Sequence, residues 1–286
     1  MSRRGFALLA VLWVLTALSV LGGVALAVAR TGSQTTRNRI LLARAGWARE
    51  ACVEILLARY AQNPAVRAVD SVDLGRGTWC RVTLEDPAAK LNLNLGSREQ
   101  LVAVLNFVSR VSVAAVDSLA DALLDYRDPD TIPRPFGAET ATNRNGPLAD
   151  VAELAYVRGF DSSLVDRLTL VLTTRGPGVI NVNAAPPEVL ATLPGMTDEA
   201  IRVLLGGRAS GRPIRSADDF AALLSKSARS ALLTAYPDFV RAATFAPAQL
   251  VARVEGGVRG TPIVARATLT LVPLPDRLAV IRRETE

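Results

Sequence analysis

The carboxylates between Asp125 and Glu139 are the side chains of this sequence best suited to chemistry. The segment reads DYRDPDTIPRPFGAE, and its acidic residues are Asp125, Asp128, Asp130 and Glu139. Calcium takes carboxylate oxygens of this kind as ligands, often from flexible loops. The spacing is not that of an EF-hand, so the residues alone leave open a calcium site of another construction.

Two other interpretations of this loop stay open. The carboxylates of Asp125 and Asp128 could pair with nearby arginines, Arg127 or Arg134, and form a solvated surface loop. Two carboxylates could also serve a glycosidase, although no aromatic-rich sugar cleft is evident nearby. The sequence contains no histidine. This absence excludes Ser-His-Asp and Cys-His catalysis and histidine-ligated zinc or iron.

The two cysteines, Cys52 and Cys80, are 28 residues apart. They could form a disulfide in an oxidising compartment. Each also stands where a small apolar residue would serve, so the sequence leaves both possibilities open.

Residues 181–224 resemble a helix-hairpin-helix, a module that in many proteins grips DNA phosphates at a Leu-Pro-Gly turn. Phosphate binding needs free backbone N–H groups at the start of the helix after that turn, which here is residues 193–195. Thr197 replaces the second glycine of the motif, and Asp198 and Glu199 occupy the first helical turn. These carboxylates satisfy the helix dipole themselves. We therefore expect a structural hairpin and no binding to nucleic acid.

The start of this motif repeats an earlier segment at an offset of 89 residues. Residues 91–94, LNLN, return as residues 180–183, INVN, and a glutamate and a leucine follow at the same spacing in both segments. A short strand thus enters a helix twice, which indicates a duplicated supersecondary unit.

A long apolar segment lies near the N-terminus, where residues 6–29 contain no charged side chain. A helix of this length spans the ~30 Å hydrocarbon core of a membrane. Helical spacing of apolar residues continues through residues 30–62, which predicts one helix from Phe6 to about Gln62 with an amphipathic second half. A secretory signal cut after Ala29 is the alternative.

The residues in front of this segment, Arg3-Arg4-Gly5-Phe6, resemble the leader of a type IV prepilin or pseudopilin. In that family a prepilin peptidase cuts after the glycine, and the new N-terminus is methylated. The resemblance implies a leader of residues 1–5, cleavage between Gly5 and Phe6, and an N-methylated Phe6. Pilins usually carry glutamate at the fifth mature position, where this chain has Ala10.

The charge distribution bears on topology and partners. The net charge of +6 is spread along the chain, too diffusely to indicate nucleic acid. Arginines are denser after the apolar segment than before it, which alone would place the C-terminal side inside. The leader instead requires Gly5 to face the cytoplasm. We therefore expect a single-pass inner-membrane protein with its C-terminal domain in the periplasm.

Alternation of polar and apolar residues predicts strands at residues 78–85, 250–255, 263–272 and 278–282. The first strand lies in region 63–95 and the others in region 247–286. Together with the N-terminal helix they predict an α+β fold, in which a pilin-like long helix packs on a small antiparallel sheet. Residues 96–246 have a helical pattern, including residues 148–157, and predict a large, mainly helical insert.

Several dispersed segments together resemble the type II secretion system minor pseudopilins of the K type. They are the leader, Ala10, the strand at 78–85, the loop DYRDPDTIPRPFGAE, PLADVAELAYVRGF, INVNAAPPEVLATLPGM and the final AVIRRE. The resemblance implies a non-enzymatic subunit at the tip of a periplasmic pseudopilus, which helps to initiate fibre assembly and protein export across the outer membrane. It also implies calcium in the inserted domain and four partners: I-type and J-type minor pseudopilins, the major pseudopilin and the prepilin peptidase.

Ala10 and the insert each predict a position at the fibre end. In pilin-like fibres the fifth-position glutamate lies among apolar helices and meets the N-terminal amine of an adjoining subunit. A subunit with no neighbour beyond it has no such amine to meet, and alanine leaves no buried charge unmatched.

The alternative function is a membrane-anchored DNA receptor of the competence type, which does not explain the sheet and the insert.

Overall fold

The computed structural model describes residues 3–63, 68–109 and 112–285, with side chains from residue 11 onward. The chain forms two compact units. The first comprises residues 1–83, 253–268 and 283–286, and the second comprises residues 84–252 and 269–282. The α+β class predicted from the sequence is confirmed, because a long N-terminal helix accompanies a small sheet.

The first unit begins with α1 (Arg3–Gln62), a single helix of 60 residues. It ends at Gln62, as the sequence predicted. From Val11 the described helix is long and apolar enough to cross a membrane. Its C-terminal part is amphipathic, because Ala45, Cys52 and Leu56 are fully buried whereas Trp47 is 77% exposed.

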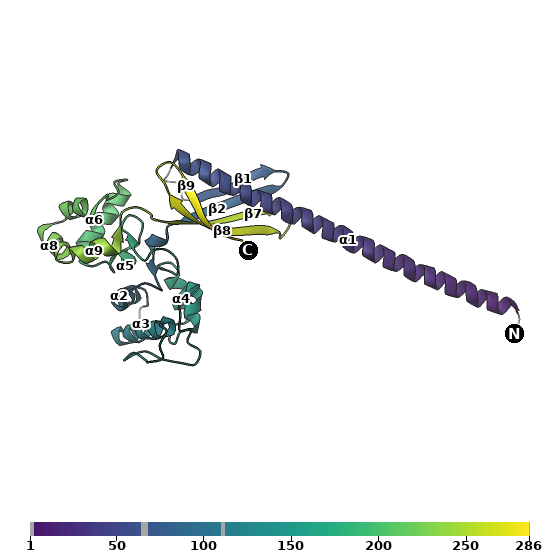
Figure 1. Ribbon diagram of the computed structural model, residues 1–286, viewed down its shortest axis with the longest axis horizontal. Coiled ribbons are helices and arrows are strands. Elements are labelled where there is room, and N and C mark those ends of the chain that lie inside the picture. Colours follow the sequence, from purple (N-terminus) through teal and green to yellow (C-terminus); the bar gives the residue numbers. More distant parts are fainter. Residues whose placement is uncertain (1–2, 64–67, 110–111, 286) are drawn as a thin grey trace. The chain divides into compact units, whose positions relative to one another are not determined.

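Five strands form the sheet in the order β1-β2-β7-β8-β9 (Figure 1). They are β1 (Ala68–Gly75), β2 (Thr78–Glu85), β7 (Leu250–Val258), β8 (Val264–Pro273) and β9 (Leu278–Thr285). Four of them were predicted, with ends that differ by a few residues. β1 was not, and it pairs antiparallel with β2 through a tight turn at residues 75–78.

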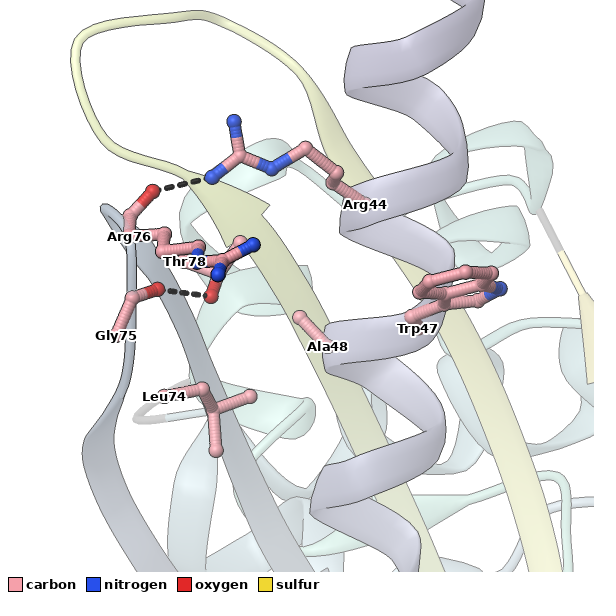
Figure 2. Close-up of a pocket in the computed structure, with 7 residues that line it drawn as sticks. All are labelled: Arg44, Trp47, Ala48, Leu74, Gly75, Arg76 and Thr78. Carbon is pink, nitrogen blue, oxygen red and sulfur yellow. Dashed lines mark hydrogen bonds between the residues drawn. The ribbon is translucent and has the colours of Figure 1, made fainter.

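Helix α1 packs closely on the sheet in the first unit. A Cβ atom on Gly256 of β7 would lie 2.2 Å from the backbone N of Arg49 and 2.5 Å from the carbonyl O of Ala45. The helix backbone therefore approaches the strand so closely that only glycine fits. At the β1–β2 turn the Arg44 guanidinium donates to the carbonyl of Arg76 (Figure 2).

The second unit is mainly helical. Its helices are η1 (Pro87–Ala89), α2 (Arg98–Val108), α3 (Val113–Arg127), η2 (Val151–Tyr156), α4 (Ser162–Leu168), α5 (Pro187–Leu190), α6 (Asp198–Ala209), α7 (Ala217–Leu223), α8 (Lys226–Thr234) and α9 (Tyr236–Ala242). Side chains that accept from the first turn cap many of them, as in the capping box of Ser97 and Gln100. The helix expected at residues 148–157 is instead the short 3-10 helix η2, capped by Asp150.

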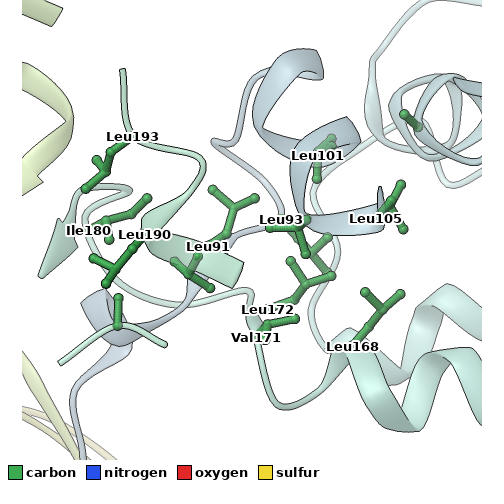
Figure 3. Close-up of a cluster of buried hydrophobic side chains, with 14 of the residues drawn as sticks. Leu91, Leu93, Leu101, Leu105, Leu168, Val171, Leu172, Ile180, Leu190 and Leu193 are labelled. Atoms are coloured by element: carbon green, nitrogen blue, oxygen red, sulfur yellow. The ribbon is translucent and has the colours of Figure 1, made fainter. Parts of the chain in front are cut away.

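Two small parallel strand pairs organise the second unit. β3 (Leu91–Asn92) pairs with β4 (Leu172–Thr173), and β5 (Ile180–Asn181) pairs with β6 (Ala243–Thr244). The unit begins at residue 84, earlier than the expected residue 96, because β3 is built into it through β4. Leu91 and Ile180, which occupy equivalent positions of the repeat, lie in one apolar cluster (Figure 3).

Candidate metal centre

Two buried carboxylates of α3 hold the predicted calcium loop. Asp125 is fully buried, and the backbone N–H of Arg134 lies 3.2 Å from each of its oxygens. Asp121, one turn earlier, is 1% exposed, and its Oδ2 accepts from the N–H of Phe136 at 3.3 Å. Burial raises the pKa of Asp125. The loop thus folds back onto the helix that precedes it.

Gly137 makes this fold-back possible. A Cβ atom at this position would lie 1.9 Å from Oδ2 of Asp125, well inside van der Waals contact. Only a residue without a side chain leaves room for the buried carboxylate. The glycine between the prolines and Glu139 therefore has a steric cause.

The loop brings Asp128, Asp130 and Glu139 together. One oxygen from each of these carboxylates lies within 4.8 Å of the other two. Burial raises the pKa of Glu139, and the charges of Asp125, Asp128 and Asp130 raise it further. Three carboxylates so close repel each other unless a cation or protons compensate them.

Three buried oxygens in this loop have no hydrogen-bond partner among the described residues. They are Oδ1 of Asp128, Oε1 of Glu139 and Oδ1 of Asn145. Two of them belong to the carboxylate cluster. Carboxylate and amide oxygens are the ligands that calcium takes in proteins, and the cluster contains no sulfur or imidazole ligand that would favour zinc. The residues present therefore fit calcium.

The structure divides the predicted ligands into two sets. Asp128, Asp130 and Glu139 form the cluster, whereas the oxygens of Asp125 accept the backbone N–H of Arg134 and lie outside it. Asn145 was not predicted. Its backbone has a φ of 49°, and its side-chain amide donates to the carbonyl of Asp130 at 3.2 Å. The Asn-Gly pair at residues 145–146 is the sequence signal for this turn.

The salt-bridge interpretation of the loop named two arginines, Arg127 or Arg134, and the structure shows the pairing with Arg134. Arg134 donates to Oδ2 of Asp128 at 3.0 Å, and its Nε lies 3.5 Å from Oδ1 of Asp125. Arg127 donates instead to the backbone carbonyls of Leu93 and Gly96. Its guanidinium therefore stabilises the first copy of the repeat, in which these two carbonyls lie.

The hairpin at residues 193–195 makes its contacts within the chain. Gly195 has a φ of 71°, and a Cβ there would lie 2.9 Å from the carbonyl O of Ala231 in α8. Glu199 accepts from the backbone N–H and the hydroxyl of Ser225 at 2.9 and 2.7 Å. The turn therefore packs against protein where a phosphate would approach. The absence of nucleic-acid binding itself stays a prediction.

The remaining predicted sites lie on α1. The structure joins Cys52 of α1 to Cys80 of β2 in a disulfide, with the Cα atoms 5.7 Å apart. Gly5, Phe6 and Ala10 belong to the first turns of α1, and their side chains lie outside the described part of the chain.

Comparisons with known proteins identify the family. Two sequence profiles described as type II secretion system (T2SS), protein K, match residues 89–176 and 180–237. The fold resembles one chain in the crystal structure of the GspK-GspI-GspJ complex from the enterotoxigenic Escherichia coli type 2 secretion system. The likeness has a TM-score of 0.59 and 19% identity, and covers 90% of this chain and 99% of that chain. A search of curated proteins gave no match. This chain belongs to the protein K family of minor pseudopilins of the type II secretion system.

Proposed function

We propose that this minor pseudopilin caps the type II secretion pseudopilus and helps to initiate its assembly. The observation that carries the proposal is the insertion of residues 86–249 between β2 and β7, which are neighbours in the pilin-like sheet. So large an insert suits a free fibre end better than a position below another subunit. Ala10 supports the same position, because it requires no amine from a subunit beyond it.

The partners in this proposal are the I-type and J-type minor pseudopilins, which meet this chain through α1, and then the major pseudopilin. The support is the likeness to one chain of a complex that contains GspI and GspJ. Co-purification of the full chain with the I-type and J-type proteins of the same bacterium tests it. A stable complex of all three is expected, and three proteins that purify separately would contradict the proposal.

Maturation and location follow from the N-terminal segment. The prepilin peptidase cuts between Gly5 and Phe6, α1 anchors the chain in the inner membrane, and the folded units lie in the periplasm. An oxidising periplasm suits the disulfide of Cys52 and Cys80. Mass spectrometry of the mature chain should give an N-methylated Phe6. An N-terminus at Arg30 would mean an ordinary secretory signal and would remove the fibre role.

The carboxylate loop is proposed to bind calcium and to stabilise the inserted unit. Asp128, Asp130 and Glu139 would supply the charged ligands, and Asn145 a neutral oxygen. The two unpaired carboxylate oxygens in the cluster support this assignment. Asp125 takes a positioning role here, because its oxygens accept the backbone N–H of Arg134.

A further inference from the structure

One basic side chain lies against the carboxylate cluster. The guanidinium of Arg134 donates to Oδ2 of Asp128 at 3.0 Å, and its Nε lies 3.5 Å from Oδ1 of Asp125. In the described part of the chain, no other basic side chain pairs with Asp128, Asp130 or Glu139. The protein therefore supplies this cluster with one positive charge.

The other arginines of the same segment are engaged elsewhere. Arg127 donates to the backbone carbonyls of Leu93 and Gly96, as described above. Arg144 pairs with Glu153 at 2.8 Å, and Glu153 lies outside the cluster. The position of Arg134 is therefore not a general property of arginines in this loop.

Each carboxylate of the cluster has one oxygen held by a donor. The three pairs are Asp128 with the guanidinium of Arg134 at 3.0 Å, Asp130 with the backbone N–H of Ile132 at 2.9 Å, and Glu139 with the side-chain amide of Asn143 at 3.0 Å. Only the donor to Asp128 carries a charge. Three ionised carboxylates have a charge of −3, and the +1 of the guanidinium leaves −2.

The guanidinium leaves the other oxygen of Asp128 free. Oδ2 accepts from Arg134, whereas Oδ1 is buried and has no partner among the described residues. Arg134 therefore does not block the cluster. Its charge nevertheless repels any cation that enters, and calcium affinity depends on the number of charged ligands in the site.

We propose that Arg134 is the resident cation of the metal-free loop and that it sets the calcium affinity of the cluster. The inference rests on the proposed calcium role and deepens it. Without metal, the guanidinium offsets part of the repulsion among the carboxylates and holds the loop to Asp125 of α3. With metal, the same charge opposes the ion. Arg134 thus raises the calcium concentration at which the loop fills.

A positioning role for Arg134 makes the opposite prediction. If the guanidinium mainly orients Asp128 for the metal, its removal weakens calcium binding, as loss of a donor behind a metal ligand does. If it mainly competes with the metal by charge, its removal strengthens calcium binding. The neutral donors of Ile132 and Asn143 show that a carboxylate of this cluster can be held without a charge. We therefore expect the effect of charge to dominate.

Neutralising Arg134 tests the proposal. The full chain in a neutral detergent would be titrated with calcium by calorimetry and melted in chelator. Arg134→Met retains an apolar stem, and the arginine is 40% exposed, so little packing is lost. We expect its Kd for calcium to fall about fivefold, whereas its melting temperature in chelator should fall below that of wild type.

Two further variants separate charge from other effects. Arg134→Lys keeps the charge, and its Kd should stay within about twofold of the wild-type value. Arg158→Met is the matched control, because Arg158 is exposed on the same unit and makes no hydrogen bond or ion pair with the residues described. It should change neither the Kd nor the melting temperature in chelator.

A higher Kd for Arg134→Met would assign the guanidinium a positioning role and overturn the proposal. So would equal changes in Kd for Arg134→Met and Arg134→Lys, or an unchanged melting temperature in chelator. If the methionine variant fails to fold, Arg134→Gln, which keeps an N–H donor without the charge, gives the same test with the same expected sign. If neither wild type nor variant binds calcium, the proposed calcium site fails, and the resident cation fails with it.

Discussion

The two copies of the repeat in the second unit share a set of hydrogen bonds, which we call the frame. They differ in the segment that follows it. In each copy the first asparagine accepts the N–H of the second, Asn92 from Asn94 at 2.9 Å and Asn181 from Asn183 at 3.0 Å. The second asparagine then makes two hydrogen bonds to one distant backbone residue, Leu148 or Ile214. The four distances are 2.7–3.0 Å.

An arginine completes the frame in both copies. Arg127 donates to the carbonyls of Leu93 and Gly96, and Arg208 donates to the equivalent carbonyls of Val182 and Ala185. Burial lowers the pKa of both guanidinium groups. The duplication predicted from the sequence thus extends to a half-buried arginine in each copy, which we call the brace and which the sequence did not reveal.

The difference begins directly after the brace. In the first copy Arg127 is followed by Asp128 and by the long loop that carries the carboxylate cluster. In the second copy the helix closes in a short turn, in which the N–H of Arg212 donates to the carbonyl of Gly207 at 2.8 Å. The comparison teaches that one frame can lead into a loop with clustered carboxylates or into a plain turn, according to the residues after the arginine.

The largest effect should come from calcium, and only through the first copy. Calcium at a hundred times its Kd should stabilise the native state by about 2.7 kcal/mol if it binds the folded state alone. Asp128→Asn with Asp130→Asn should abolish this gain, whereas Asp198→Asn in the second copy should retain it. Thermal melting with calcium and with a chelator measures both. An equal calcium shift in the double variant would assign the metal elsewhere.

The two braces should contribute similarly to stability and differently to calcium. Arg127→Met and Arg208→Met each leave buried carbonyls without a donor and should each cost about 1–3 kcal/mol of unfolding free energy. Only Arg127→Met should also weaken calcium binding, because Asp128 is the next residue. Denaturant unfolding and calcium titration of both variants decide this. Equal loss of calcium affinity in both would break the comparison.

Glycine-to-alanine changes should have opposite signs in the two copies. Gly137→Ala overlaps Asp125 and should destabilise by about 1–3 kcal/mol. At Gly206 in α6 a Cβ atom would meet no neighbouring atom within 4 Å, so Gly206→Ala should stabilise by about 0.5–1 kcal/mol. Urea midpoints of the two variants give the comparison, and a neutral Gly137→Ala would remove the steric account of the fold-back.

The smallest expected effect is in the pH dependence of stability without calcium, to which Glu139 and Glu199 should contribute with opposite signs. Burial and neighbouring carboxylates raise the pKa of Glu139. Its contribution to the stability of the folded state is therefore present below the unfolded pKa of about 4.3 and is lost as pH rises through the folded pKa. The N–H and hydroxyl of Ser225 lower the pKa of Glu199. Its contribution is present above the unfolded pKa and is lost as pH falls through the folded pKa.

Melting curves in chelator from acid to neutral pH test this contrast. Glu139→Gln should raise the neutral-pH midpoint, and Glu199→Gln should lower it. A fall in the midpoint for both variants would mean that Glu139 stabilises the metal-free loop.

Much of the fold could be predicted because its sequence signals are local. Helix α1, strand β2 and the asparagine repeat depend on residues within a few positions of each other. β1 was missed because only Val69 is buried along it, so apolar alternation is weak. The short helices α4, α8 and α9 were also missed. They begin at capping side chains or at proline and lack the long periodic pattern by which a helix is predicted.

The site was harder to predict because it depends on the fold-back of its loop. Asp125, Asp128 and Asp130 look alike in the sequence, yet Asp125 is buried against the backbone of Arg134 and the other two face each other. Asn145, whose amide oxygen is also buried in this loop, is brought near Asp130 by a turn at the far end of the segment. Neither relation has a fixed spacing that a motif could record.

The measurement that tests the tip assignment most directly is cysteine crosslinking along α1 in assembled fibres. Single cysteines on the exposed part of the helix would be oxidised in the presence of the I-type, J-type and major pseudopilins. The account predicts crosslinks to the other minor pseudopilins and none between two copies of this chain. Crosslinks to copies both above and below it within a fibre, as expected for the major pseudopilin, would contradict the capping role.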